Sequence, residues 1–323
     1  MISIALCTYN GESYIDELLL SITNQTFQPD EIIICDDKST DDTVSKIKSI
    51  LDDWTGNYRL IVNESNLGYK KNFQKAISLC DGDIIFLCDQ DDVWNVAKIA
   101  KVMEVFDHRN DVIMVFHDAE LVDENLNTIS PSLWKELGFN YHNFLNGDFS
   151  HFVKGNMVQG AACAFRKELF DISVPFPTNA IHDEWLALNA MINGEIYPLH
   201  DSLLKYRQTG KNEIGAINNS FLSKIKGLNK LSFKLRNRFY EIDRYANVWN
   251  VLQKKYMLIN TDTKYTKYQY VKSISKFYCS RGESISQHKL SKLPSFFDYM
   301  NMYNHRMDSL STYFKDVLSI CSM

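Results

Sequence analysis

Residues 82–94 read GDIIFLCDQDDVW, an apolar run that ends abruptly in acidic residues. Its apolar part is short and rich in β-branched and aromatic residues, which is typical of a strand buried on both faces. Two earlier runs have the same form, ISIALC at 2–7 and EIIICDD at 31–37. Segments with helical apolar spacing lie between these runs. This alternation predicts an α/β fold, with a mostly parallel sheet covered by helices on both faces.

The helical segments show their apolar faces in the sequence. After the first strand, Ile15, Leu18, Leu19 and Ile22 recur at the three- and four-residue spacing of one helical face. The same criteria predict further strands at 59–62, 112–116, 157–166 and 202–206, and further helices around 44–51, 68–79, 94–106 and 183–192. Residues 120–155 have no regular pattern, and we interpret them as loops.

Polar residues gather where the predicted strands end. They are TYN at 8–10, DD at 36–37 and DQDD at 89–92. Ligands of open parallel sheets bind beyond the carboxyl ends of the strands. Carboxylates that follow buried strands need a neutralising charge, so the pattern predicts a divalent cation site facing a ligand crevice. The alternative is an acidic helix N-terminus, where the helix dipole favours Asp.

Composition restricts the class of protein. The chain has 323 residues, of which 45% are hydrophobic and 23% charged, so it is globular rather than disordered. No apolar run approaches the roughly 20 residues of a membrane-spanning helix, and the first residues lack the features of a signal peptide. The cysteines at 7, 35, 88 and 163 lie in apolar runs, which predicts buried thiols, no disulfide framework and a cytoplasmic protein.

Six blocks of sequence, in order, carry a resemblance to a known family. The blocks ISIALCTYNG, EIIICDDKSTDDT, NESNLGYKKNFQKAI and GDIIFLCDQDDVW resemble the inverting family 2 glycosyltransferases, which have the GT-A fold. The wording CDQDDVW, HDEWLAL and YRQTGKNEIGA is similar to bacterial rhamnosyltransferase-like members. The resemblance covers 1–216, which implies a GT-A catalytic domain there and leaves a basic helical region at 217–323.

The resemblance implies which residues bind a nucleotide-sugar donor. Thr8 and Tyr9 match nucleoside-contacting positions, and Asp37 matches the acid that holds the base or ribose. Lys71 falls where relatives often carry a basic residue near the nucleotide, although a solvated helix lysine is an equal alternative. The full set expected at the nucleotide sugar is Thr8, Tyr9, Asn10, Asp36, Asp37, Lys71, Asp89 and Arg207.

The acidic motif implies a metal site. Asp89 and Asp91 match the outer positions of the family's DxD motif, and Asp91 is expected to be the direct ligand of Mg²⁺ or Mn²⁺. Asp92 is expected either as a further ligand or as the cap of the next helix. A cation held there would neutralise the departing nucleoside diphosphate.

A second acidic motif implies the catalytic base. Asp183, in His182-Asp183-Glu184-Trp185, aligns with the family's general base, and Glu184 is the alternative carboxylate. A carboxylate is suited to accept the proton of an acceptor hydroxyl as its oxygen attacks the anomeric carbon. The alternative role of Asp183 is that of an N-cap residue that opens its helix.

One position departs from the family pattern. Many relatives follow the last strand with Tyr-Arg-x-His, whose histidine completes the metal shell or contacts the diphosphate, whereas this chain has Thr209 there. Arg207 is retained and is suited to pair with phosphate oxygens. The QxxRW block of processive synthases is absent, which favours transfer of one sugar per encounter.

The resemblance implies a specific reaction, with one alternative. The expected donor is dTDP-L-rhamnose, otherwise a UDP-hexose, and the expected acceptor is a hydroxyl of a lipid-linked surface glycan such as O-antigen or capsule. The missing histidine motivates the alternative, a degenerate GT-A scaffold in a polysaccharide assembly complex. A nucleotidyltransferase is disfavoured because CTYNGESY has no basic residue for a phosphate loop.

Charge is distributed unevenly. Residues 221–281 carry 14 Lys and Arg against 3 Asp and Glu, a net charge of +11, whereas 1–220 carry 17 against 33, a net charge of −16. The basic helices predicted there either lie on an anionic membrane surface, which would make the protein peripheral on the inner face of the membrane, or pack on the acidic domain. No nucleic-acid-binding motif occurs. Residues 296–320 have helical spacing suited to a bundle or a homodimer contact.

Overall fold

A computed structural model describes residues 1–146, 156–178, 180–209 and a few short stretches between 248 and 281. The chain divides into two compact units. The first comprises Met1–Asn146, Met157–Phe176 and Ile181–Ala216, and it holds every element named below. The helices predicted beyond residue 216, and the segment proposed for a homodimer contact, lie almost entirely outside the described residues.

The first unit alternates strands and helices as predicted. Its strands are β1 (Ile2–Thr8), β2 (Glu31–Asp36), β3 (Asn57–Val62), β4 (Ile84–Asp89), β5 (Val93–Trp94), β6 (Val112–Val122), β7 (Thr128–Ser130), β8 (Cys163–Arg166) and β9 (Glu195–Arg207). Its helices are α1 (Ile15–Thr23), α2 (Thr43–Leu51), α3 (Tyr69–Ser78), α4 (Lys98–His108), α5 (Leu133–Leu137), α6 (Tyr141–Leu145), the 3₁₀ turn η1 (Gly160–Ala162), α8 (Lys167–Ser173) and α9 (His182–Asn193).

The strands form one sheet in the order β3-β2-β1-β4-β8-β6-β9-β5, with β7 paired to β6. Strands β3, β2, β1 and β4 are parallel, β8 is antiparallel to β4 and to β6, and β6 is parallel to β9. The predicted α/β class is therefore confirmed. Because β1, β2 and β4 are parallel neighbours, their carboxyl ends meet at one edge of the sheet.

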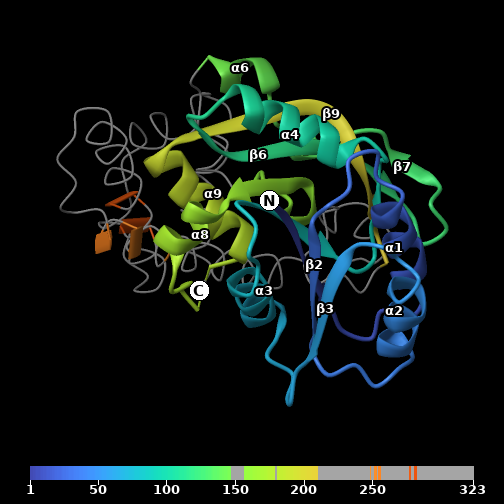
Figure 1. Cartoon of the computed structure of the whole chain (residues 1–323). Coiled ribbons are helices and arrows are strands. Elements are labelled where there is room, and N and C mark those ends of the chain that lie inside the picture. The colour runs from blue at the N-terminus through green and yellow to red at the C-terminus, as the bar shows by residue number, and fades with distance from the viewer. Residues whose placement is uncertain are drawn as a thin grey trace, which may run out of the picture. The chain divides into compact units, whose positions relative to one another are not determined.

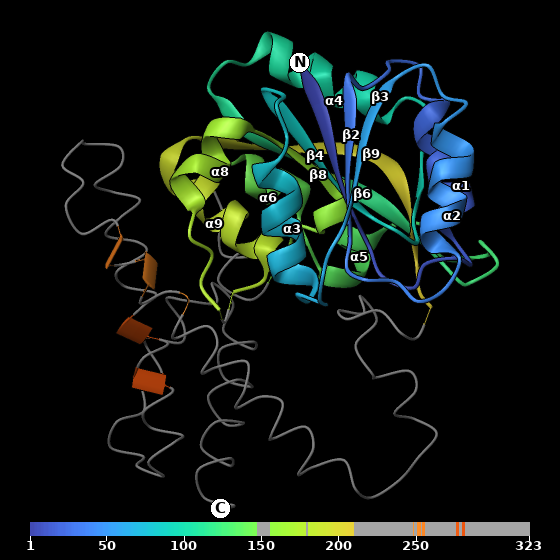
Figure 2. The ribbon, with the colours of Figure 1, turned by 60° about the horizontal axis from the view of Figure 1, so that its bottom comes forward.

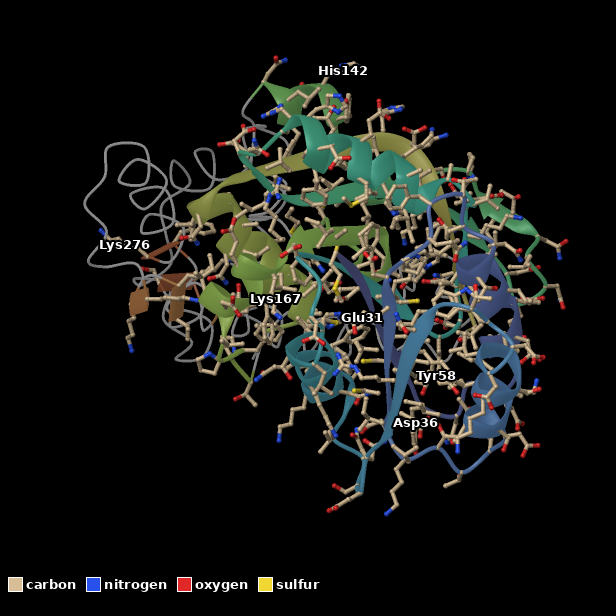
Figure 3. All side chains as sticks on the ribbon, in the orientation of Figure 1. Glu31, Asp36, Tyr58, His142, Lys167 and Lys276 are labelled. Carbon is tan, nitrogen blue, oxygen red and sulfur yellow. The ribbon has the colours of Figure 1, made fainter. Side chains whose placement is uncertain are left out.

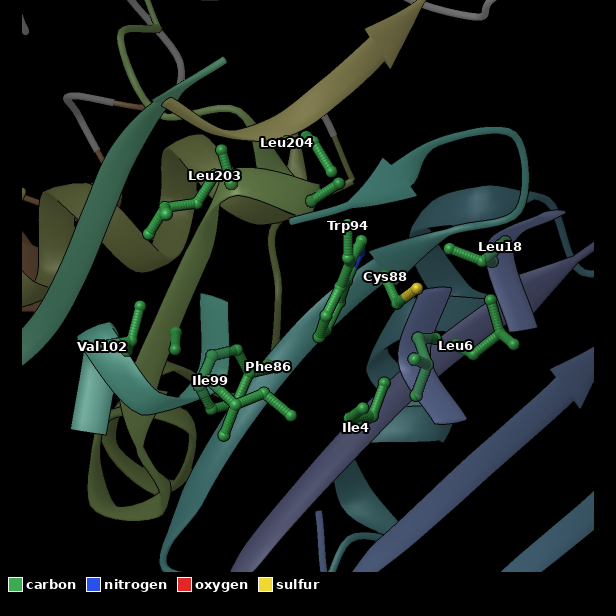
Figure 4. Close-up of a cluster of buried hydrophobic side chains, with 14 of the residues drawn as sticks. Ile4, Leu6, Leu18, Phe86, Cys88, Trp94, Ile99, Val102, Leu203 and Leu204 are labelled. Carbon is green, nitrogen blue, oxygen red and sulfur yellow. The ribbon is translucent and has the colours of Figure 1, made fainter. Parts of the chain in front are cut away.

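Helices cover both faces of this sheet. Figures 1 and 2 show α1 and α2 on one side of the strands and α3, α8 and α9 on the other. The first face holds a core in which even-numbered strand residues such as Ile4, Leu6 and Phe86 pack against α1, α2 and α4 (Figure 4). The four apolar residues predicted to line one face of α1 are all fully buried there, which confirms that prediction. Burial of each such side chain contributes about 1.5–3 kcal/mol.

Several segments differ from their predictions, among them α8, which was not predicted, and β9, which begins at Glu195 rather than at residue 202. The helix expected from residue 94 begins at Lys98, because 93–94 instead form β5 and pair with β9. The region interpreted as loops contains β7, α5 and α6, and β6 itself extends to Val122. Ser132 caps α5 by accepting a hydrogen bond from the Lys135 amide, a local bond that hydrophobic periodicity does not reveal. Within 157–166 only the last four residues are extended, after η1.

The cysteines at 7, 35, 80, 88 and 163 are buried free thiols, which confirms the prediction for the four of them that were considered. Burial raises the pKa of Cys7, Cys88 and Cys163, so these thiols are inert rather than reactive. Within the described ranges, no helix is long and apolar enough to cross a membrane.

Candidate active site

A cavity of about 830 Å³ opens at the carboxyl ends of the parallel strands. It is lined by residues from the ends of β1, β2, β4 and β9 and from the starts of α3 and α9. Seven of the residues expected at the site are among them: Thr8, Tyr9, Asn10, Asp37, Asp89, Asp91 and Asp183. Others were not predicted as site residues, notably Tyr69, Gln90, His182, Tyr206 and Thr209.

Asp36 holds the strand ends together. Its Oδ2 accepts hydrogen bonds from the hydroxyls of Thr8 at 2.8 Å and Ser39 at 2.6 Å, and its Oδ1 accepts the Ser39 amide at 2.8 Å. Asp36, labelled in Figure 3 at the end of β2, is fully buried and is not among the described residues that line the cavity. The structure thus places this carboxylate behind the cavity, where it orients Thr8.

Asp37 lines the cavity and organises the loop that leads into α3. Its Oδ1 accepts the amide of Leu67 at 2.7 Å and the side-chain amide of Asn63 at 2.8 Å. Its Oδ2 accepts the amide of Gly68 at 2.8 Å. Gly68 has φ +77°, a conformation that favours glycine, so the sequence of this loop suits the turn that brings its amides to the carboxylate.

A side-chain amide joins β1 to β4 at the cavity. Gln90 accepts the Tyr9 amide at 2.8 Å and donates to the Tyr9 carbonyl at 3.0 Å, which reproduces the pairing of a further strand residue. The side chain needs Gly11 beside it, because a Cβ there would lie 2.3 Å from Gln90 Oε1. Asn10 is fixed in turn, since its Oδ1 accepts the Thr40 amide at 2.9 Å. Sequence reasoning passed over Gln90, although it is the middle residue of the DxD motif.

Three carboxylates meet at the cavity. Burial, and then the charges of Asp91 and Asp183, raise the pKa of Asp89 to about 8. Both causes disfavour the charged carboxylate: burial removes its hydration, and the neighbouring negative charges repel it. Within the described part of the chain, no three His, Cys, Asp or Glu side chains are gathered closely enough to hold a metal by themselves. One or two carboxylates do suit Mg²⁺ or Mn²⁺ if phosphate oxygens and water complete the shell.

Asp92 lies behind the cavity. It is fully buried, its Oδ1 accepts the Arg207 amide at 3.1 Å, and its Oδ2 has no hydrogen-bond partner among the described residues. Burial and the charges of Asp91 and Asp89 raise its pKa. The alternative that Asp92 caps the next helix is wrong, because α4 begins six residues later with Ala97 as its N-cap.

A buried lysine lies beside these acids. Lys98 is fully buried, donates to the carbonyl of Ala161 and places Nζ 3.6 Å from the ring centre of Trp94. Burial lowers its pKa to about 8, although Asp92 and Asp89 favour its charged form. Sequence analysis missed it, and the available signal was a lysine at a position in register with the apolar face of its helix.

Asp183 is the second residue of α9 and lines the cavity. The alternative that it is the N-cap is wrong, because Ile181 occupies that position without a side-chain cap. Its Oδ1 accepts the Glu184 amide at 2.7 Å. Glu184 is buried and is not among the described lining residues, so of the two carboxylates the structure places Asp183 at the cavity.

Two basic residues lie away from the cavity. Lys71 is exposed on α3, and neither it nor Arg207 is among the described residues lining the cavity. Arg207 is 2% exposed and its Nε donates to the carbonyl of Asp91 at 2.7 Å, so it supports the DxD turn from behind. Thr209, at the position of the family's histidine, does line the cavity.

A model of the glycosyl transferase family 2 matches residues 3–172, more than half of the chain. The chain belongs to glycosyltransferase family 2. It is 30% identical over 261 residues to the dTDP-rhamnosyl transferase RfbG of Shigella flexneri, a match that covers 75% of this chain and 83% of that protein. It is also 26% identical over 213 residues to an uncharacterized protein of Mycobacterium tuberculosis, covering 64% of this chain but only 58% of that relative.

Two solved structures are similar in fold to this family 2 chain. Residues 1–349 of S. aureus TarS, in complex with UDP-GlcNAc, match with a TM-score of 0.59 and 17% identity, covering 98% of this chain and 81% of that one. The mannosyltransferase PcManGT of Pyrobaculum calidifontis, in complex with GDP-Man and Mn²⁺, matches with a TM-score of 0.54 and 15% identity, covering 99% and 84%. The expected GT-A fold is confirmed.

Proposed function

We propose that this chain is an inverting glycosyltransferase, which moves one sugar from a nucleotide diphosphate donor to a hydroxyl group of a growing glycan. The observation that carries the proposal is the convergence of Asp89, Asp91 and Asp183 on one cavity at the carboxyl ends of the parallel strands. Membership of family 2 supports it. The same carboxylates argue against a degenerate scaffold, because like charges in one cavity are costly unless a ligand uses them.

The strand-end residues bind the nucleoside in this proposal. Thr8, Tyr9, Asn10 and Asp37 line one part of the cavity, and Tyr9 is 47% exposed, so its ring is available to a ligand. Asp37 already accepts three hydrogen bonds from the chain, so its position is fixed before a base or ribose arrives. Asp36 acts through Thr8, whose hydroxyl it holds.

Asp183 is the general base in the proposed mechanism. It accepts the proton of the acceptor hydroxyl, whose oxygen attacks the anomeric carbon from the face opposite the nucleotide. The bond from the anomeric carbon to the diphosphate oxygen breaks and its electron pair stays with the diphosphate, so the configuration inverts. Asp91 and Asp89 are the residues that would hold Mg²⁺ or Mn²⁺, and such a cation supplies positive charge to the leaving diphosphate. Asp92 orients the turn from behind.

The donor and acceptor belong to the same proposal. The name of the relative RfbG supports dTDP-L-rhamnose as the donor, with UDP-hexoses as the next class. A hydroxyl of a lipid-linked surface glycan is the proposed acceptor. Residues 1–216 form the catalytic domain, and the basic segment 221–281 brings it to an anionic membrane surface. Sedimentation with vesicles tests this last step: binding to anionic vesicles and not to neutral ones is expected, and equal binding to both contradicts it.

Release of nucleoside diphosphate from a panel of dTDP- and UDP-sugars tests the activity. The assay uses the full chain with Mg²⁺, Mn²⁺ or a chelator, and compares wild type with Asp91→Asn. We expect slow hydrolysis of one donor, lost with the chelator and lowered at least about 100-fold in the variant. Asp107→Asn, an exposed carboxylate on α4, is the matched control and keeps full activity. Absence of both turnover and donor binding in wild type rejects the proposed function.

A further inference from the structure

The imidazole of His182 is fixed in the wall of the cavity. His182 is the first residue of α9 and 6% exposed. Its ring stacks on Phe73 of α3, with centroids 4.1 Å apart and planes at 14°, and meets the edge of Tyr69 at 6.0 Å. Figure 2 shows α3 and α9 side by side on the same face of the sheet. Two aromatic side chains therefore hold the ring in one orientation.

The two nitrogen atoms of the His182 ring make no hydrogen bond within the described structure. Neither Nδ1 nor Nε2 has a hydrogen-bond partner among the described residues, although both atoms are buried. A buried donor or acceptor left without a partner costs about 1–3 kcal/mol, and a phenylalanine would stack equally well without that cost. His117 differs in degree: its Nδ1 reaches the Asp118 carbonyl at 2.8 Å, and among the described residues only its Nε2 lacks a partner. The cost at His182 indicates a polar partner that the described residues do not supply.

Gly160 lies against both His182 and Asp183, which line the cavity. A Cβ at residue 160 would lie 3.0 Å from His182 Nε2 and 3.4 Å from Asp183 Oδ2, so these two atoms face the same space. The backbone of Gly160 is not in the left-handed region, so an alanine would fit its conformation without strain. A side chain at residue 160 would therefore crowd the imidazole and the carboxylate.

We propose that His182 positions the attacking hydroxyl group for Asp183, an inference that rests on the proposed function. The Nε2–H of the neutral ring donates to the hydroxyl oxygen, and this contact directs the hydroxyl proton toward Asp183 Oδ2. No bond to His182 forms or breaks. Burial and the nearby charge of Lys70 lower the pKa of His182 to about 3, which keeps the ring neutral at physiological pH and agrees with this role.

Turnover and donor binding together test the inference. Both assays use the full chain and the donor that wild type hydrolyses, with water in place of the acceptor. His182→Phe keeps the stacking and is expected to lower hydrolysis about fivefold while the donor dissociation constant stays within about twofold, since one hydrogen bond contributes about 1 kcal/mol. His182→Gln, which retains an N–H donor, recovers part of the loss. His117→Phe is the control matched for burial and size, and it keeps wild-type turnover.

Three outcomes overturn the inference. Turnover of His182→Phe equal to wild type rejects it, and so does a loss of donor affinity that matches the loss of turnover, because the imidazole would then contact the donor. Gly160→Ala tests the same space with His182 intact, and it is expected to lower turnover with unchanged donor affinity. An unaffected Gly160→Ala also rejects the inference. A wild type that binds and hydrolyses no donor rejects the proposed function itself.

Discussion

Replacement of Arg207 by methionine is expected to destabilise the fold and loosen the DxD turn. The guanidinium donates from Nε to the carbonyl of Asp91 at 2.7 Å and from Nη1 to the carbonyl of Glu124, and its Nη2 pairs with the carboxylate of Glu17. Its central carbon lies 4.8 Å from the ring centre of Tyr14. Methionine fills much of the same volume but supplies no donor, so both carbonyls and the carboxylate lose this partner.

The Asp91 carbonyl dominates the expected cost, because Glu124 is exposed and water can solvate its carbonyl. An acceptor shielded from water and left without a donor costs about 1–3 kcal/mol, and the lost cation–π contact adds about 0.5–1 kcal/mol. Glu17 contributes less than about 1 kcal/mol, because its side chain is 51% exposed and water solvates the released carboxylate. We therefore expect Arg207→Met to lower the free energy of unfolding by about 3 kcal/mol. Denaturant unfolding followed by tryptophan fluorescence measures it.

Glu17→Gln is the matched control for this variant. Its amide oxygen still accepts from Arg207, so a loss below about 1 kcal/mol is expected. Nucleoside diphosphate release is expected to fall at least about tenfold in Arg207→Met, because Arg207 no longer holds the backbone carbonyl of Asp91 and the Asp91 carboxylate loses its fixed position. If Arg207→Met lowers the free energy of unfolding no more than Glu17→Gln does, the reasoning that the guanidinium supports the turn is refuted.

Three further predictions concern the cavity. Asp183→Asn is expected to lower donor turnover by about 10²–10⁴-fold with roughly unchanged donor affinity, because an amide accepts no proton. A loss of donor affinity in calorimetry as large as the loss of turnover would contradict this. The folded-state pKa of Asp89, about 8, exceeds its unfolded value of about 3.9, so the folded protein retains a proton that the unfolded chain loses. Stability in chelator therefore declines as pH rises from about 4 to about 8, and denaturation of Asp89→Asn should lack this slope. Gly11→Ala displaces the Gln90 amide and is expected to weaken nucleotide binding measured by calorimetry, and unchanged affinity would count against the bridge.

The sequence sufficed for those parts of the fold that depend on local pattern. Strand runs, the buried face of α1 and the order of elements follow from periodicity, and the parallel topology then brings strand ends together. This is why Asp37 and Asp89 could be expected near one ligand, whereas Asp183, 146 residues after Asp37, was expected there from the family resemblance. Where local and tertiary preferences disagree, as at 93–94, pairing with β9 prevailed over helical periodicity.

The sequence did not suffice for contacts that join distant segments. Arg207 was expected at the phosphates, but Glu17, 190 residues away, and the Asp91 carbonyl hold its guanidinium behind the turn. Gln90 was passed over because its role depends on the backbone of a residue 81 positions earlier. Lys98 looks like a surface residue until packing encloses it beside the acids. Side-chain direction at such positions is decided by tertiary packing, which no local pattern encodes.

The cross-linked strand ends have a thermodynamic consequence. Asp37 fixes the amides of Leu67 and Gly68, and Gln90 fixes the backbone of Tyr9, before any nucleotide is present. A loop that folds around its ligand loses conformational entropy in the binding step, at about 1–2 kcal/mol per ordered residue. Here folding has already ordered these residues, so donor binding does not have to order them. The free energy of their contacts with a donor therefore contributes in full to the binding affinity.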